Sequence, residues 1–504
     1  MGGMRMEKGK VWLLGAGPGD AGLLTLKGKE MLEKADTVVY DSLVGPAILA
    51  MIPGKARQIN VGKRAGHHTM PQEEINKVLL EESLKGQNVV RLKGGDPFLF
   101  GRGGEELELL KENGIPYEII PGVTSAIAVP AYNGIPVTHR DFCSSVHIIT
   151  GHKRDGKSSG INYKALVSAE GTLVFLMGVT ALPDICRGLM EAGMDPKTPA
   201  AVLQQGTTAG QRRVLADLKT LPEEAASHEI HAPAIIVVGK VCALSEEFAW
   251  REHLPLFGKR VIVTRPKESQ SKMAERLREE GAEVLELPTI ETVPVTDRSH
   301  VLEAAANMAS YKWLVFTSPA GVRIFFDMMK DADMDIRSIG QVKIAAIGRG
   351  TSAGLKERGL FADLMPEIYD GEHLGKALAA VVQKGDRVLI PRAEIGNQEL
   401  VQILTEAGAV VDDAAAYRTV YRTSLPAGAD HYLSKEIMCI AAFTSSSTVE
   451  GFVRTMAGAD FSFVRAACIG HKTAETAEKY GMKWETAQEA SIESLINLIK
   501  EMAE

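Results

Sequence analysis

The chain has 504 residues and a formal net charge of −7, with 45% hydrophobic and 24% charged residues. This length predicts two or more domains, and the composition is ordinary for a soluble globular protein. The acidic balance argues against general binding to nucleic acid or to an anionic membrane. No apolar run approaches the ~20 residues of a membrane span, and residues 1–6 lack the apolar stretch of a signal peptide. We therefore expect a cytoplasmic protein with no membrane partner.

Metal and disulfide chemistry is not expected. The five cysteines are scattered and form no Cys-x-x-Cys pair, so they predict buried small residues in a reducing compartment. The histidines at 67–68 and at 139, 147 and 152 have no carboxylate or cysteine at ligand spacing. The sequence thus predicts no metal site.

Strands and helices alternate through the first half, which predicts an α/β architecture. A helix is expected over residues 70–84, where Thr69 and Gln72 suit a capping box and Pro71 suits the first turn. Two sheets with a cleft between them are the natural arrangement. The expected strands cover residues 11–14, 37–40, 89–92 and 117–120, then 145–150, 172–177, 200–204 and 234–238.

A glycine-rich loop follows the third of these strands. Gly94 and Gly95 let the backbone turn and approach a ligand closely, because no Cβ stands in the way. Asp96 is then available to accept hydrogen bonds from a ribose or an amino group. Loops at the carboxyl ends of strands are where open α/β sheets bind small molecules.

The turn at residues 15–20 invites a dinucleotide-binding interpretation, which fails. The fingerprint Gly-x-Gly-x-x-Gly is broken by Asp20, and Pro18 removes an amide that could hold a pyrophosphate. Phosphate binding is therefore not expected there.

The two glycine turns belong to an ordered set of motifs. Its other members are Asp41 after a strand, Gly62-Lys63-Arg-Ala-Gly66, Thr124-Ser125, Met177-Gly178 and Gln-Gln-Gly206-Thr-Thr. From about residue 10 to 243 the set resembles the uroporphyrinogen-III C-methyltransferase family. The resemblance implies the two-subdomain class III tetrapyrrole methyltransferase fold over residues 9–244. It also implies S-adenosylmethionine as co-substrate, two methylations of uroporphyrinogen III (at C2 and C7) to precorrin-2, and a homodimer.

The family's catalytic positions match Asp41 as base and Lys63 as acid or carboxylate anchor. Plainer interpretations are an N-cap on the following turn for Asp41 and a solvated loop lysine for Lys63. Met177 suits the core equally well, since thioethers fill gaps. The positions that match the family's cofactor site are Pro18, Gly94, Gly95, Asp96, Leu99, Thr124, Ser125, Met177 and Gly206.

The chain is expected to divide near residues 244–257 by a partly ordered joint. Beyond it the sequence repeats itself, with about 127 residues between Thr317 and Thr444 and between Arg265 and Arg392. Such self-similarity predicts two related α/β lobes. Each Thr-Ser pair stands between a strand and a helix, so it suits both a helix N-cap and a helix N-terminus that binds ligand carboxylates.

This half resembles uroporphyrinogen-III synthase over residues 257–504. The resemblance implies one lobe of residues 257–290 plus 424–504 and another of 291–420. It also implies that hydroxymethylbilane loses water and closes with inversion of the last ring, and that Tyr417 is the candidate for proton handling, although a tyrosine at a strand end is more often structural. The implied substrate-binding residues are Arg265, Thr317, Ser318, Gly348, Arg392, Thr444, Ser445 and Thr473.

Three interpretations follow. The leading one is a bifunctional enzyme of tetrapyrrole biosynthesis, a transferase and a lyase in one chain. The second is a related methyltransferase with another acceptor, and the third makes the C-terminal half a non-catalytic tetrapyrrole-binding module. The sequence leaves open whether the product feeds sirohaem or cobalamin synthesis and whether intermediates pass between the modules.

Overall fold

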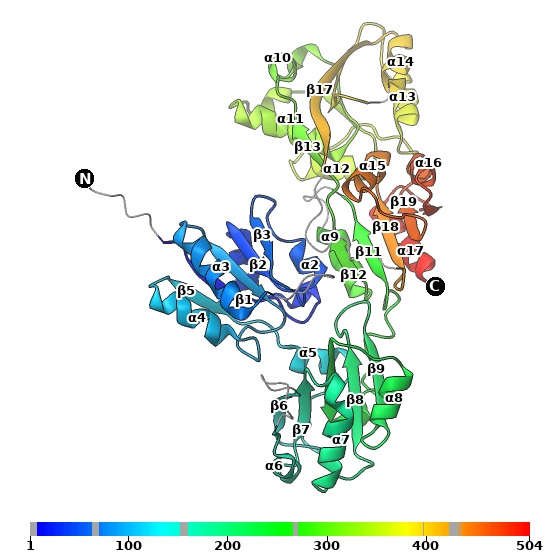
Figure 1. Cartoon of the computed structure of the whole chain (residues 1–504). Helices are drawn as coiled ribbons and strands as arrows, with labels where there is room; N and C mark the ends of the chain where they lie inside the picture. Colours follow the sequence, from blue (N-terminus) through cyan, green and yellow to red (C-terminus); the bar gives the residue numbers. More distant parts are fainter. Residues whose placement is uncertain are drawn as a thin grey trace, which may run out of the picture.

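The computed structural model describes residues 8–62, 70–151, 160–265, 271–396, 398–422, 433 and 435–504. Within these ranges the chain forms four five-stranded sheets (Figure 1). Helices contribute core residues to both faces of each of these four sheets. The α/β class expected from the sequence is confirmed.

The first sheet has the strand order β3-β2-β4-β1-β5, and all of its pairs are parallel. Helices α1 and α2 supply core residues to one face, and α3 and α4 supply them to the other. The inner strands β1, β2 and β4 are buried at every residue, as expected for a sheet covered on both sides. The elements are β1 (Val11–Gly15), α1 (Leu26–Glu33), β2 (Thr37–Tyr40), α2 (Pro46–Leu49), β3 (Arg57–Asn60), α3 (Gln72–Leu84), β4 (Val89–Lys93), α4 (Gly103–Glu112) and β5 (Tyr117–Ile120).

The predicted capping box of α3 is wrong. The helix begins at Gln72 with Pro71 as its N-cap, and no side chain caps it. Thr69 lies outside the described residues. The amide of Gln72 instead donates to Asn76 Oδ1 at 2.9 Å and to Glu106 Oε1 at 3.2 Å. These side-chain bonds join the first turn of α3 to its second turn and to α4.

The second sheet is mixed, with the order β6-β7-β10-β8-β9. Its β6–β7 pair is parallel, and its remaining pairs are antiparallel. Helix α5 leads out of the first sheet and packs on one face, while α6, α7 and α8 pack on the other. The elements are α5 (Ser125–Tyr132), β6 (Val146–Thr150), α6 (Tyr163–Ser168), β7 (Thr172–Leu176), α7 (Leu182–Glu191), β8 (Pro199–Gln204), β9 (Arg212–Asp217), α8 (Leu221–Ser227) and β10 (Ala234–Val238).

The joint after the second sheet is ordered, because it packs on α5. Ser245 Oγ donates to the Asn133 carbonyl at 2.6 Å, and Trp250 Nε1 donates to the Ala131 carbonyl at 3.1 Å. The guanidinium of Arg251 lies 4.8 Å from the centre of the Tyr132 ring. These contacts fix the direction in which the chain enters its second half.

Two further sheets form the second half. Lobe one is the sheet β12-β11-β18-β19-β20 with its helices, and its strands are all parallel. Helices α9 and α17 cover one face, and α15 and α16 cover the other. The elements are β11 (Arg260–Val263), α9 (Ser271–Glu279), β12 (Glu283–Glu286), β18 (Cys439–Phe443), α15 (Ser446–Thr455), β19 (Val464–Cys468), α16 (His471–Lys479), β20 (Lys483–Thr486) and α17 (Ile492–Ala503).

Lobe two is the sheet β13-β17-β16-β14-β15 with its helices, and β13 alone is antiparallel to its neighbour. Helices α10, α11 and α12 cover one face, and α13 and α14 cover the other. The elements are β13 (Ile290–Pro294), α10 (Ser299–Ala306), β14 (Trp313–Phe316), α11 (Pro319–Asp331), β15 (Lys343–Ala346), α12 (Arg349–Lys356), α13 (Gly371–Ala379), β16 (Arg387–Ala393), α14 (Glu399–Glu406) and β17 (Val410–Tyr421).

The two lobes repeat one another, as the sequence predicts. The parallel order β17-β16-β14-β15 in lobe two corresponds to β12-β11-β18-β19 in lobe one. The long strand β17 and its partner β13 run from lobe two toward lobe one (Figure 1). At their base the buried Thr289 donates to the carbonyls of Thr264 and Thr448, both at 3.2 Å. These bonds tie the connecting strands into lobe one.

Lobe one also packs against the first half of the chain. Ala47 of α2 belongs to the same buried cluster as Ile262 and Leu285 of lobe one. The backbone N–H of Ala209 donates to Glu283 Oε2 at 3.2 Å. The segments that follow β2 and β8 are therefore supported by lobe one.

Candidate functional site: an interlobe pocket and a glycine-loop edge

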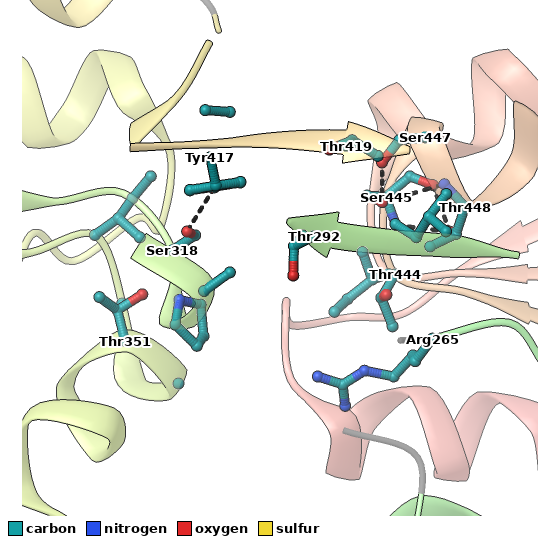
Figure 2. Close-up of a pocket in the computed structure, with 18 of the residues that line it drawn as sticks. Arg265, Thr292, Ser318, Thr351, Tyr417, Thr419, Thr444, Ser445, Ser447 and Thr448 are labelled. Atoms are coloured by element: carbon teal, nitrogen blue, oxygen red, sulfur yellow. Dashed lines mark hydrogen bonds between the residues drawn. The ribbon is translucent and has the colours of Figure 1, made fainter. Parts of the chain in front are cut away.

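A pocket of about 1150 Å³ lies between the two lobes of the second half. Figure 2 shows Ser318, Thr351 and Tyr417 on the lobe-two side and Arg265, Thr444 and Ser445 on the lobe-one side, with Thr292 of β13 between them. Residues that lie far apart in sequence are brought together because both lobes turn the carboxyl ends of their parallel strands toward this space. The pocket is large enough for a sizeable organic ligand.

Four helices begin at the pocket wall: α11 after Ser318, α12 after Gly348, α15 after Ser445 and α17 after Ser491. Ser318 Oγ accepts the N–H of Gly321 at 2.9 Å, and Ser445 forms a reciprocal capping box with Thr448. The serines are thus N-caps, and the remaining first-turn amides give each helix start a partial positive charge. Several such starts in one wall favour a ligand that carries several carboxylates.

Arg265 is the cation that best suits a ligand carboxylate. It lines the pocket, and it forms no ion pair with any residue in the described ranges. Burial lowers its pKa, because removal from water penalises the charged form. Arg349 and Arg418 also line the pocket, opposed by Glu394 and Glu450. The pocket therefore combines the half-buried cation Arg265 and two exposed cations with two carboxylates.

Tyr417 lies inside β17, not at a strand end as its sequence context predicts. Its side chain is 7% exposed, and its hydroxyl lies 2.8 Å from Ser318 Oγ. Burial raises the pKa of the phenol, and the bond to Ser318 opposes part of that shift. The tyrosine is therefore a neutral hydroxyl that faces the pocket and is held by the cap of α11.

Six of the predicted residues of this half line the pocket, namely Arg265, Ser318, Gly348, Tyr417, Thr444 and Ser445. Thr317, Arg392 and Thr473 are not among its lining residues. Arg392 differs most from expectation, because its Nε and Nη2 donate to Asp413 Oδ1 and Oδ2, each at 2.6 Å. A guanidinium held by its own neighbour strand is not available for a bidentate contact with a ligand.

Several lining residues were missed by the motif analysis. Thr292 lies in the strand that crosses between the lobes and Glu450 lies in α15, and neither was assigned a ligand role from the sequence. Arg349 and Arg418 stand within the motifs around Gly348 and Tyr417, where they were given no role.

In the first half, the loops after β1 and β4 lie side by side. Gly17 and Gly95 exchange backbone hydrogen bonds of 3.1 and 2.7 Å. Gly95 has φ +66°, and a Cβ there would find only Ser125 N within 4 Å, at 3.9 Å. The backbone of Gly95 is therefore open to close approach at this point, next to the start of α5.

Asp96 and Asp20 have structural partners. Asp96 Oδ1 accepts the N–H groups of Phe98 and Leu99, and Oδ2 accepts that of Gly122 at 3.0 Å. Asp20, which breaks the dinucleotide fingerprint, accepts the Tyr132 hydroxyl at 3.0 Å through its carboxylate. Its backbone N–H donates to Thr207 Oγ1. Both carboxylates pin loops together, which leaves Asp96 fewer lone pairs for a ligand than the sequence suggests.

The remaining predicted cofactor residues surround the same edge. Thr124 caps α5 and Ser125 begins it, while Leu99 packs against the cluster that contains Val129 of α5. Gly206 lies against α5, where a Cβ would stand 2.3 Å from Val129 Cγ1. Pro18 lies in the turn between Gly17 and Gly19, beside these loops.

Met177 is not a core residue, because it is 54% exposed and has φ 55°. Left-handed backbone at a non-glycine residue is strained and clusters at functional sites. Such strain is not visible in the sequence, although Met177, Gln205 and Thr207 belong to the ordered set of motifs. In the loops after β4, β7 and β8 the strained residues are Phe100, Arg102, Met177, Gln205 and Thr207.

Asp41 follows β2 and faces a buried cation. Its Oδ1 accepts the N–H of Leu43 at 3.0 Å, and its Oδ2 accepts Arg91 Nη2 at 3.3 Å. The bond from Leu43 caps the turn that follows β2, as the plainer interpretation expects, and the same carboxylate also pairs with Arg91. Lys63, its predicted partner, lies outside the described residues.

The described ranges contain no group of three or more side chains suited to hold a metal ion. No helix within them is long and apolar enough to cross a membrane. Cys186, Cys242, Cys439 and Cys468 are buried, and burial raises the pKa of each thiol to about 12.

Family models match both halves of the chain. The tetrapyrrole (corrin/porphyrin) methylase model matches residues 10–222, and the uroporphyrinogen-III synthase HemD model matches residues 271–497. A porphyrin biosynthesis protein HemD from Ruminiclostridium josui is 47% identical over 505 residues, which is 99% of each chain. The uroporphyrinogen-III C-methyltransferase of Bacillus subtilis (strain 168) is 40% identical over 359 residues, 71% of this chain and 73% of that protein.

A siroheme synthase from Pseudomonas putida (strain W619) is 49% identical over 246 residues, 49% of this chain and 53% of that protein. Among solved structures, the uroporphyrin-III C-methyltransferase of Thermus thermophilus with S-adenosylhomocysteine covers 47% of this chain and 99% of its own, at 38% identity and TM-score 0.41. A uroporphyrinogen III synthase from the same organism covers 48% and 98%, at 20% identity and TM-score 0.35.

Proposed function

This chain belongs to the family that fuses uroporphyrinogen-III C-methyltransferase to uroporphyrinogen-III synthase, and we propose that it catalyses two successive steps of tetrapyrrole synthesis. The C-terminal module cyclises hydroxymethylbilane to uroporphyrinogen III with inversion of the last ring. The N-terminal module methylates that product at C2 and C7 to give precorrin-2. We assign residues 9–244 to methyl transfer and residues 257–504 to cyclisation.

The observation that carries the cyclisation is the interlobe pocket with its converging helix starts. Hydroxymethylbilane bears eight carboxylates, which suit the first-turn amides of α11, α12, α15 and α17 and the guanidinium of Arg265, which has no ion pair among the described residues. Holding these carboxylates bends the linear chain so that its two end rings meet. The protein thus favours one closure over the uncatalysed one mainly by positioning.

Water loss is the step that needs a proton. The hydroxymethyl C–O bond breaks, water leaves, and a cationic azafulvene remains until ring closure releases a proton. The neutral hydroxyl of Tyr417 faces the pocket and is held by Ser318, so we assign it to donate to the departing hydroxyl. Ser318, Gly348, Thr444 and Ser445 are assigned to bind substrate, whereas the placement of Arg392 favours a structural role.

For methyl transfer we assign S-adenosylmethionine to the edge beside Gly95, bordered by Pro18, Leu99, Thr124, Ser125, Met177 and Gly206. The sulfonium supplies an electrophilic methyl group. The S–CH₃ bond breaks as a ring carbon forms a new C–C bond, and S-adenosylhomocysteine leaves. The porphyrinogen then loses a proton, for which Asp41 is the proposed acceptor. Lys63 is proposed as its acidic or carboxylate-anchoring partner.

The decisive test supplies pure full-length protein with hydroxymethylbilane, with and without S-adenosylmethionine. Uroporphyrinogen III without the cofactor, and a two-methyl product with it, are the expected results. If supplied uroporphyrinogen III is methylated but the bilane closes only to the type I isomer, the C-terminal module binds tetrapyrroles without catalysing closure. We further propose a cytoplasmic homodimer formed through the N-terminal module. Its product, precorrin-2, would serve sirohaem or cobalamin synthesis.

A further inference from the structure

A cluster of buried charges lies directly beneath Asp41. This Glu106 cluster consists of Arg91 and Lys93 of β4 and Glu106 of α4, and the Glu106 side chain is 0% exposed. Glu106 Oε1 accepts Arg91 Nε at 3.0 Å and Lys93 Nζ at 2.8 Å. Arg91 Nη2 continues to Asp41 Oδ2 at 3.3 Å. A continuous chain of contacts thus links a fully buried carboxylate to the proposed base.

A purely structural role explains this cluster poorly. Removing charged groups from water costs several kcal/mol per ion, and apolar side chains of similar volume often stabilise a fold more. Among the described residues Glu106 Oε2 has no hydrogen-bond partner, so the cluster is not fully satisfied by them. Arg57 and Glu82 form a more ordinary pair at 2.8 Å nearby, in which the arginine side chain is 62% exposed.

The geometry fixes the carboxylate of Asp41 from two directions. The turn of its own loop holds Oδ1 through Leu43, and Arg91 holds Oδ2 from the sheet. Arg91 is itself fixed, because its Nη1 donates to the carbonyls of Val39 and Leu92 and its Nε donates to Glu106. A lysine at position 91 is a single point charge and could not bridge both carboxylates.

We propose that Arg91 and Glu106 are positioning residues for methyl transfer, which hold the carboxylate of Asp41 aligned to accept the proton that the methylated porphyrinogen loses. This inference rests on the proposed role of Asp41. Lys93 completes the cluster: burial and the charge of Arg91 lower its pKa, while Glu106 raises it. Glu106 thus accepts hydrogen bonds from two buried cations, Arg91 and Lys93.

The test is a double-mutant cycle in the full-length chain with E106Q, R91K and D41N. The substitution E106Q keeps the shape and removes the charge. Steady-state methylation of uroporphyrinogen III and calorimetric binding of S-adenosylhomocysteine are measured for each variant. We expect E106Q and R91K to lower kcat by about tenfold or more, with KM and cofactor affinity changed by less than about threefold. Combining either with D41N should lower kcat no further than D41N alone.

Two controls separate this effect from unfolding. R57Q removes an arginine–glutamate pair of the same chemistry and is expected to leave kcat unchanged. Cyclisation of hydroxymethylbilane by the same preparations reports the integrity of the rest of the chain. If E106Q fails to fold, the cycle with R91K decides.

The outcomes distinguish the two proposals. Wild-type kcat in D41N would refute Asp41 as base, whatever E106Q does. If D41N alone has a low kcat and adding E106Q lowers kcat by the same factor as it does in the wild-type chain, the two effects are independent. Asp41 would then keep its role as base, and the positioning role of Glu106 would be overturned. A change confined to KM in E106Q and R91K would overturn it as well.

Discussion

Arg265 and Arg392 occupy corresponding places in the sequence repeat, yet the structure predicts opposite consequences for their loss. Arg265 lines the pocket without an ion pair in the described part of the chain. A charge-assisted hydrogen bond is worth about 1.5–3 kcal/mol, which corresponds to about 10- to 150-fold in affinity. Arg265→Gln should therefore raise KM for hydroxymethylbilane by that factor. Stability should hold or rise, because a desolvated charge is removed.

Arg392→Gln should act on stability instead. In the unsubstituted protein Asp413 accepts two hydrogen bonds of 2.6 Å from the buried guanidinium of Arg392. The substitution removes both and leaves the Asp413 carboxylate without its cation. Breaking a fully buried pair costs about 3–5 kcal/mol, and the 30% exposure of Asp413 brings the expected loss to about 2–3 kcal/mol. At about 2–4 °C per kcal/mol for a module of this size, Tm should fall by about 5–10 °C.

Two measurements on each variant check this pair of expectations. Initial rates of uroporphyrinogen III formation over a range of bilane concentrations give kcat and KM, and thermal unfolding followed by circular dichroism gives Tm. Ionic strength is held constant, because exposed charges are screened by salt. The reasoning would be refuted by two results together. Arg392→Gln would keep the wild-type Tm and show a tenfold higher KM, and Arg265→Gln would keep the wild-type KM.

The other predictions concern one residue each. Tyr417→Phe should lower the cyclisation kcat by about 10²-fold if the hydroxyl handles the proton, while Tm changes little because one neutral hydrogen bond is lost; an unchanged kcat would sink that role. Gly206→Ala should weaken S-adenosylhomocysteine binding by about tenfold or more, since its Cβ meets Val129 Cγ1 at 2.3 Å, and Val129→Ala should restore binding. Lys10 and Lys27 hold the pKa of Glu118 at about 2. The stability that Glu118 contributes over Glu118→Gln should therefore be present above its unfolded pKa of about 4.3 and vanish as pH falls toward 2, as measured by urea unfolding.

Local patterns in the sequence determined the elements and their class. The strand at residues 37–40 is found as expected, and the expected strand at 200–204 differs from the observed one by a single residue. Apolar runs and glycine turns act within a few residues, so one sequence suffices to identify them. The repeat between Thr317 and Thr444 likewise predicts two related lobes. In the structure the two lobes have corresponding strand orders.

Only the tertiary structure decided which of the matching residues face a ligand. Arg265 and Arg392 share a motif, but their surroundings differ. Asp413 on the neighbouring strand pairs with Arg392, whereas no acid of the described residues pairs with Arg265. Met177 is exposed and strained, which decides against the core position that its sequence allowed equally, and α3 begins after Pro71 without the side-chain cap that its sequence suggests. Hydrogen-bond partners and exposure depend on residues far away in the chain, which no local pattern records.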